Sequence, residues 1–148
     1  LAGRPNVPFS APSGIVWGEP HGVAALASNG LHAASWIFLL KALYDAGLPL
    51  QTGSMGWTAV WQGKAPVYRS FPTGGLYRWT RQPVYLGFTL VLWLGPAWTL
   101  DHVLLASAWT LYCLLGPLHK ERRLLARHGP SYSEYQSHVP YFVPRIRT

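Results

Sequence analysis

The sequence predicts an all-α fold that is integral to a membrane, with about three transmembrane helices. Charged residues make up only 11% of the 148 residues, whereas hydrophobic residues make up 49%; soluble chains average roughly 25% charged residues. The chain also contains 8 Trp and 8 Tyr, which concentrate at membrane–water interfaces. Three apolar runs without a formal charge approach the length that crosses a bilayer: 22–40, 84–100 and 102–118.

The length of the chain favours one domain. Residues 1–21 are rich in Pro and Gly and are predicted to be an extended N-terminal segment, followed by a single membrane domain over 22–148. Its predicted spans lie near 22–43, 83–100 and 102–119, and a cytoplasmic tail follows over 120–148. The chain begins at Leu1 and not at Met, and the sequence leaves open whether it is processed or a fragment.

Two spans form a predicted helical hairpin whose turn lies at Gly95–Trp98, where Gly and Pro favour a break. A charged helical extension over Lys120–Arg127 follows the hairpin, and Gly129 is suited to end it. Ser131–Ser137 is predicted to be a short helix with Ser131 as its N-cap.

The linker after the first span contains a further predicted helix, Met55–Gln62. Its Trp57 and Trp61 lie one turn apart, as expected for a helix in the membrane interface.

The basic residues predict the orientation of the hairpin. Ten of the 12 Lys and Arg lie beside its open ends, and the tip over 95–101 has none: Lys64, Arg69, Arg78, Arg81, Lys120, Arg122, Arg123, Arg127, Arg145 and Arg147. Since cytoplasmic loops carry the excess of basic residues, the open ends and the C-terminus are predicted to be cytoplasmic. A bacterial inner membrane is the expected location.

Composition argues against several other classes of protein. The net charge of +7 does not indicate nucleic-acid binding, because the basic residues flank apolar spans and do not form one solvated face. The single cysteine, Cys113, excludes an intrachain disulfide and a cysteine-based zinc cluster. His119, His128 and His138 lack metal-ligand spacing, so no metal site is predicted.

The loop before Pro83 is the candidate binding segment. Gly74 and Gly75 can expose backbone N–H groups to an anion, and Arg78 and Arg81 offer forked donors for a carboxylate or phosphate. Tyr77 and Tyr85 can form an aromatic wall. The alternative is a basic, aromatic segment that anchors to lipid headgroups.

Glu121 is the acidic residue of the hairpin's charged exit and lies among basic residues. Its side chain either forms a surface ion pair, which stabilises a fold little, or binds an amine, a ribose hydroxyl or a cationic ligand.

Two motifs resemble a known family. Thr-x-Gly-Leu-Tyr-Arg-x-x-Arg-x-Pro-x-Tyr-x-Gly runs over 73–87, and Glu-Arg-x-Leu at 121–124 precedes Gly129, Tyr132, Tyr135 and Val139-Pro140. Together they are similar to small integral-membrane S-adenosylmethionine methyltransferases, the isoprenylcysteine carboxyl methyltransferase and phospholipid methyltransferase superfamily. The closest resemblance is to the methanethiol S-methyltransferase and NnrU-like group.

The resemblance implies methyl transfer from S-adenosylmethionine, with S-adenosylhomocysteine as product, to a small thiol or lipid acceptor at the cytoplasmic face. Arg81 and Glu121 would be the catalytic residues, and the cofactor would be bound by Gly75, Tyr77, Arg81, Gln82, Tyr85 and Glu121. The expected partners are the bilayer, the acceptor and other membrane subunits.

Two positions depart from the family pattern. Gln82 stands where the family has His, and Lys120 stands where it has the first Glu of a pair. Gln cannot exchange a proton near neutral pH, and Lys reverses a charge. The alternative function is therefore a catalytically degenerate member that acts as a structural subunit of a larger membrane complex.

Overall fold

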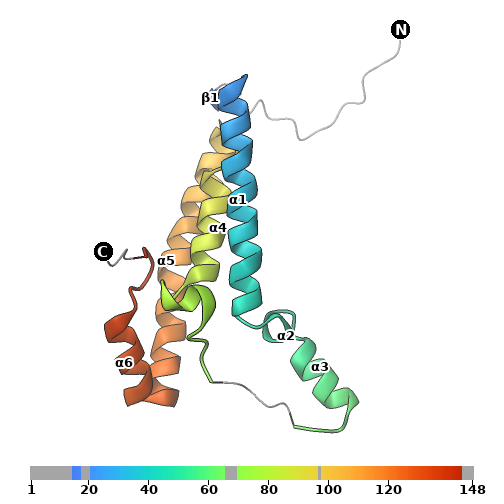
Figure 1. Cartoon of the computed structure of the whole chain (residues 1–148), viewed down its shortest axis with the longest axis vertical. Helices are drawn as coiled ribbons and strands as arrows, with labels where there is room; N and C mark the ends of the chain where they lie inside the picture. Colours follow the sequence, from blue (N-terminus) through green and yellow to red (C-terminus); the bar gives the residue numbers. More distant parts are fainter. Residues whose placement is uncertain (1–14, 18–20, 66–69, 97, 145–148) are drawn as a thin grey trace.

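The computed structural model describes residues 15–17, 21–65, 70–96 and 98–144. The fold is mostly helical, as predicted. Its body consists of three helices side by side: α1 (Val23–Asp45), α4 (Pro83–Trp93) and α5 (Leu100–His128). α4 packs against both α1 and α5, and each neighbour runs in the opposite direction to it (Figure 1).

Small side chains allow α1 and α4 to approach closely. The buried residues of α1, Ser35, Leu39 and Ala42, recur every three to four positions and so form one stripe of the helix. Gly87 of α4 faces this stripe, since a Cβ atom on it would lie 3.0 Å from the Leu39 Cα. A larger residue at position 87 would push the two helices apart.

The tip of the hairpin contains a short strand pair. β1 (Ile15–Trp17) is antiparallel to β2 (Trp98–Thr99), with Ile15 opposite Thr99. The predicted helix over 83–100 is therefore too long, because α4 ends at Trp93. Gly95 and Pro96 follow that end, and both residues disfavour a continuing helix. The rest of the predicted segment 1–21 lies outside the described residues, apart from its final residue, His21.

α5 joins the predicted third span and its charged extension in one continuous helix. The Thr99 Oγ1 caps its start by accepting a hydrogen bond from the His102 N–H at 3.2 Å. Its buried residues, Ala106, Cys113, Pro117 and Glu121, share one face, so the same stripe packs against α4 and carries Glu121 to the open end. Gly129 follows with φ 54°, a value that glycine adopts readily, and ends the helix as predicted.

α6 (Pro130–His138) turns back beside the end of α5 (Figure 1). The predicted N-cap at Ser131 is wrong: Gly129 is the N-cap, and the Ser131 hydroxyl donates to the His128 carbonyl at 2.9 Å. The reason is Pro130, whose fixed φ and missing N–H suit the first helical position.

α2 (Leu48–Gln51) and α3 (Ser54–Trp61) extend away from the three-helix body (Figure 1). The helix predicted over 55–62 is thus confirmed. Trp57 and Trp61 stack with ring centroids 5.7 Å apart, and they are 67% and 79% exposed.

One helix in the described part of the chain, α1, is long and apolar enough to cross a membrane. α4 is apolar but has only 11 residues. The count of three spans stays a prediction.

Candidate functional site

At the open end of the hairpin, the two motif segments of the sequence meet at Glu121. The Arg81 Nη1 donates to the Glu121 Oε2 at 2.7 Å, and the Gln136 Nε2 donates to the same oxygen at 3.0 Å. The Gln82 Nε2 donates to the other oxygen, Oε1, at 3.0 Å. The Glu121 and Arg81 side chains are only 9% and 13% exposed. Charged hydrogen bonds to a buried carboxylate are stronger than neutral ones, so this cluster holds α5, α6 and the loop before α4 together.

The loop that carries Arg81 is also attached to α1. Its helical turn η1 (Gly75–Arg78) begins where the Leu76 N–H donates to the Asp45 Oδ2 at 2.9 Å. Lys41 forms an ion pair with the same carboxyl group. Gly75 has φ 59°, and a Cβ atom on it would lie 2.2 Å from the Asp45 Oδ2. Glycine is therefore required at position 75 by both the backbone and the contact.

The segment after α6 fastens the same loop from its other side. The Arg81 N–H donates to the Pro140 carbonyl at 3.0 Å, and the buried Thr80 hydroxyl donates to the Phe142 carbonyl at 2.8 Å. The Arg81 guanidinium also lies 5.4 Å from the centroid of the Tyr141 ring, a cation–π contact. Arg81 is thus held through both its backbone and its side chain.

A cavity of about 120 Å³ borders this cluster. Aromatic rings form much of its wall: Phe71, Tyr77, Tyr132 and Tyr135. The Phe71 ring packs edge-on against Tyr132, with centroids 5.0 Å apart, and the Tyr135 hydroxyl donates to the Tyr77 carbonyl at 2.7 Å. Arg81, Gln82 and Lys120 supply the polar part of the wall.

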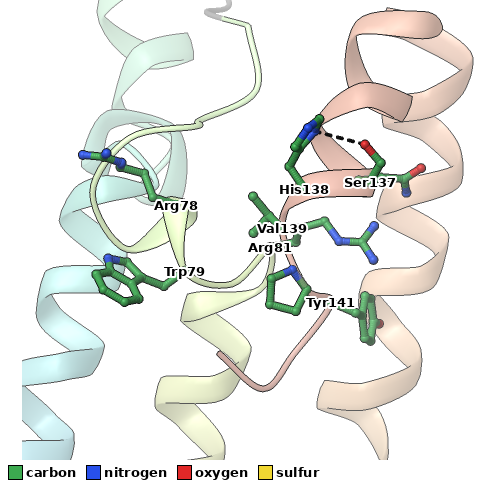
Figure 2. A pocket seen from close by; sticks show the side chains of 9 residues that line it. Arg78, Trp79, Arg81, Ser137, His138, Val139 and Tyr141 are labelled. Carbon is green, nitrogen blue, oxygen red and sulfur yellow. Dashed lines mark hydrogen bonds between the residues drawn. The ribbon is translucent and has the colours of Figure 1, made fainter. Parts of the chain in front are cut away.

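A larger groove of about 680 Å³ also borders the cluster. Figure 2 shows Arg78 and Trp79 on one flank and Ser137, His138 and Tyr141 on the other. Arg81 lines both the groove and the cavity, and its guanidinium extends toward Tyr141. The two spaces therefore share this one side chain.

Two polar atoms of the cluster are buried without a hydrogen-bond partner among the described residues: the Arg81 Nε and the Gln82 Oε1. Buried polar atoms are almost always paired in folded proteins. An unpaired guanidinium edge can bind an anion, and an unpaired amide oxygen can accept a proton donor.

Burial changes the acidity of the groups around the cavity. It raises the pKa of Tyr77 to about 12 and that of Tyr132 to about 12, because the phenolate would lose its hydration. Burial lowers the pKa of Lys120 below its ordinary value, while the Glu121 carboxylate opposes this shift. The tyrosines therefore stay neutral near neutral pH.

Four of the predicted site residues come together: Tyr77, Arg81, Gln82 and Glu121. The other two are placed elsewhere in the described structure, since Gly75 contacts Asp45 and the Tyr85 ring lies 6.4 Å from the Tyr112 ring. Neither of these lines the cavity or the groove.

The sequence analysis missed two partners of these segments: Gln136, which donates to Glu121, and Asp45, which accepts from the Leu76 N–H. Gln136 directly follows the motif residue Tyr135, which could have drawn attention to it. No sequence signal marked Asp45 as the partner of a loop 31 positions away.

Comparison with known proteins finds several relatives of this chain. Over 131 residues, the chain is 34% identical to methanethiol S-methyltransferase 2 of Bradyrhizobium diazoefficiens, a match that covers 88% of the chain and 50% of the relative. It is similar to methanethiol S-methyltransferases. The enzyme of that name from Crocosphaera subtropica is 29% identical over 136 residues, covering 91% of the chain and 53% of the relative. The enzyme of that name from Mycobacterium tuberculosis is 38% identical over 84 residues, a match that covers 57% of the chain and 34% of the relative.

These relatives confirm the resemblance drawn from the two motifs. The chain spans about half the length of the first two relatives. No family model matches it. No solved structure matches it either.

Proposed function

We propose that this chain binds S-adenosylmethionine at the Arg81–Glu121 cluster and transfers its methyl group to a small thiol at the cytoplasmic face of a membrane. The observation that carries the proposal is the cluster itself, because it joins the two motifs on which the resemblance rests. The names of the relatives support a small thiol as the acceptor.

The residues present fit the proposed cofactor. The groove of about 680 Å³ lies within the roughly 300–1,000 Å³ range of small-molecule pockets. The buried Arg81 Nε has no partner among the described residues, and a carboxylate of the cofactor would satisfy it. Glu121 and the Pro140 carbonyl hold Arg81 in place for this contact.

When bound, S-adenosylmethionine supplies a methyl group that is already activated by its positively charged sulfur. The protein then has to align donor and acceptor and exclude water. In this chain Arg81 would bind and orient the cofactor, since its guanidinium is fixed between Glu121 and the Tyr141 ring. Phe71, Tyr77, Tyr132 and Tyr135 line the adjacent cavity with aromatic rings, which favours displacement of water by a bound ligand.

The proposed setting is a bilayer, and the composition and one structural feature support it. α1 has the length and hydropathy of a membrane span. The excess of Lys and Arg at the open end supports a cytoplasmic location for the cluster and the C-terminus. In this topology the strand pair at the hairpin tip lies on the opposite side of the membrane, which for a bacterial chain is the inner membrane.

A second candidate function is a structural subunit of a larger membrane complex. One observation favours it: Glu121 already accepts hydrogen bonds from Arg81, Gln82 and Gln136. A carboxylate that already accepts three hydrogen bonds can have a purely structural role. Co-purification with other membrane proteins in a fixed ratio, together with no affinity for S-adenosylhomocysteine, would support this candidate.

Methyl transfer by the purified chain in detergent tests the proposal. The chain is incubated with methanethiol and S-adenosylmethionine that carries an isotopic label in its methyl group, and the labelled thioether is measured in the headspace. We expect product from the wild-type chain and a large loss in Arg81→Ala. An Arg123→Ala variant is the matched control, because Arg123 is exposed on α5. No labelled thioether from the wild-type chain would contradict the proposal.

A further inference from the structure

We infer, on the basis of the bilayer setting in the proposed function, that one face of α3 binds the headgroup region of an anionic lipid bilayer. The face consists of Trp57, Val60 and Trp61. It lies on the arm formed by α2 and α3, which extends away from the three-helix body (Figure 1). The contact is separate from the Arg81–Glu121 cluster and requires no methyl transfer.

The three side chains form a continuous apolar face. Residues three and four positions apart are neighbours on the surface of a helix, so Val60 and Trp61 both lie beside Trp57. Val60 is 82% exposed, and the two stacked indole rings are exposed as well. Contiguous exposed apolar patches mark sites where a protein contacts a membrane or another protein. The described residues leave this face open for such a contact.

The rest of α3 is polar or buried. Ala59 is buried on the side opposite the two Trp residues, and α3 packs against α2. Thr58 and Gln62 are exposed polar residues. The helix is therefore amphipathic, like helices that lie in the plane of a membrane interface. Trp suits this depth because its ring is apolar while its N–H can meet water.

The end of α1 marks the level of the membrane surface. Tyr44 is exposed there, and the Lys41 Nζ lies 5.7 Å from the centroid of its ring. Tyr is enriched at the ends of membrane spans, and Lys side chains near such ends extend to the interface. Only α2 separates α3 from this end of α1. The apolar face of α3 therefore lies close to the level at which the proposed span leaves the hydrocarbon.

Charge favours an anionic lipid as the partner. The segment 46–64 contains no Asp or Glu, and its one charged residue, Lys64, is exposed just after α3. The cytoplasmic leaflet of a membrane is negatively charged and attracts Lys near its surface. A contact between the α3 faces of two copies would instead bring two Lys64 side chains together, and juxtaposed like charges are unfavourable.

The contact would also place the candidate site relative to the bilayer. α2 connects α1 to α3, and its Gln51 lines the cavity of about 120 Å³. Ala46, which follows the end of α1, lines the same cavity. Binding of α3 to the headgroups would therefore hold this wall of the cavity at the membrane surface.

Spin labels on α3 test the contact. Val60→Cys in a Cys113→Ala background is labelled with a nitroxide, and the full chain is reconstituted in vesicles of phosphatidylcholine and phosphatidylglycerol. Electron paramagnetic resonance measures collisions of the label with oxygen, which dissolves in the bilayer, and with a neutral, water-soluble nickel chelate. We expect the Val60 label to collide mainly with oxygen. A label at Gln62→Cys, on the polar side of the same helix, should collide mainly with the chelate.

Two results for the Val60 label would overturn the inference. Equal access of the chelate to the Val60 and Gln62 labels would place the apolar face in water. A Val60 label that neither reagent reaches would show that protein covers the face, as in a dimer of the chain.

Removal of the indole rings tests their part in the contact. Trp57→Ala combined with Trp61→Ala should move the Val60 label toward the chelate, because the face loses its two interfacial anchors. Leu31→Ala is the control, since it truncates an exposed apolar residue of α1, and it should leave the Val60 label where it is. An unmoved label in the double variant would overturn the role of the two Trp residues.

Lipid composition tests the preference for anionic headgroups. The chelate should reach the Val60 label more readily in vesicles of phosphatidylcholine alone than in vesicles that contain phosphatidylglycerol. Lys64→Gln should remove this difference, whereas Arg123→Gln, at an exposed position of α5, should retain it. Equal access in the two kinds of vesicle with Lys64 present would overturn the preference.

A label at Ile37→Cys separates this inference from the bilayer setting. Ile37 is 68% exposed on α1, so in the proposed setting its label collides with oxygen and not with the chelate. If the Ile37 label meets oxygen while the Val60 label meets the chelate, the inference fails and the bilayer setting stands. If the chelate reaches the Ile37 label, both fail together. Absence of methyl transfer by the chain would change neither result.

Discussion

Arg81 and Glu121 lie 40 positions apart in the sequence, yet the Arg81 Nη1 and the Glu121 Oε2 are 2.7 Å apart. Arg81 lies in the loop before α4 and Glu121 lies on α5, so their contact closes the open end of the hairpin. Both side chains are largely buried. A buried ion pair is costly to break from one side, because the remaining charge stays without a partner.

Glu121→Ala should therefore destabilise the fold by about 3 kcal/mol or more, as for removal of one partner of a buried ion pair. The loss also leaves the side-chain amides of Gln82 and Gln136 without their acceptor. Denaturant unfolding in detergent, followed by circular dichroism, measures the change. Glu134→Ala is the control, since Glu134 is exposed on α6, and its change should stay within about 0.5 kcal/mol. Equal effects of the two substitutions would contradict the role of Glu121.

Gly75→Ala should destabilise the chain by about 1–3 kcal/mol, because a non-glycine residue would adopt a left-handed conformation there. The added methyl group would also collide with Asp45 and disturb the hydrogen bond to the Leu76 N–H. Gly74→Ala is a matched control one position away: its φ is −94°, and a Cβ atom there has no neighbour within 4 Å. The unfolding midpoints of the two variants should differ clearly. Two equal midpoints would show that the Asp45 contact is unimportant.

Stability should fall as the pH rises from 10 to 12. The ordinary pKa of Tyr is 10.0, and burial raises that of Tyr77 to about 12. Within this window the unfolded chain loses the Tyr77 proton while the folded chain keeps it, so the folded state binds more protons and loses stability as pH rises. Tyr77 accounts for roughly 2–3 kcal/mol of the loss in folding stability between pH 10 and 12. Tyr77→Phe should show a smaller fall in pH-dependent unfolding experiments, and an unchanged fall would contradict the assignment.

Leu100→Cys and Ser133→Cys should be labelled from opposite sides of the membrane. Both positions are exposed; Leu100 begins α5 at the hairpin tip, and Ser133 lies on α6 at the open end. The positive-inside rule predicts labelling of Ser133→Cys from the cytoplasm and of Leu100→Cys from the outside. A Cys113→Ala background removes the one native cysteine, which is buried. Labelling of both positions from one side would contradict the proposed topology.

The sequence was most informative where local chemistry decides structure. The mostly helical fold, the α5 extension to Gly129 and the short helix at Trp57 and Trp61 follow from apolar runs, charge distribution and glycine placement. The end of α4 at Trp93 was missed, although Gly95 and Pro96 marked the turn, because the uncharged run continues beyond it. An uncharged run shows that a segment is apolar, but it does not show where a helix ends.

The site was predictable in its motif residues and not in its contacts. Arg81 and Glu121 were both singled out, but their ion pair depends on how α4 and α5 pack. Asp45 was missed for the same reason, since its carboxylate reaches the loop only when α1 packs against α4 and η1. Gly75 was predicted to bind the cofactor, and its contact with Asp45 in the fold was not foreseen. Long-range contacts of this kind leave no local pattern in one sequence.

The most direct test of the central claim is a calorimetric titration of the purified chain in detergent with S-adenosylhomocysteine. The proposed site predicts measurable heat with the wild-type chain, and an affinity loss of about 1.5–3 kcal/mol in Arg81→Ala because a charged hydrogen bond is removed. Arg123→Ala, at an exposed position of α5, should bind as the wild-type chain does. No heat with S-adenosylhomocysteine or S-adenosylmethionine at high micromolar concentrations would contradict the account and favour the structural-subunit function.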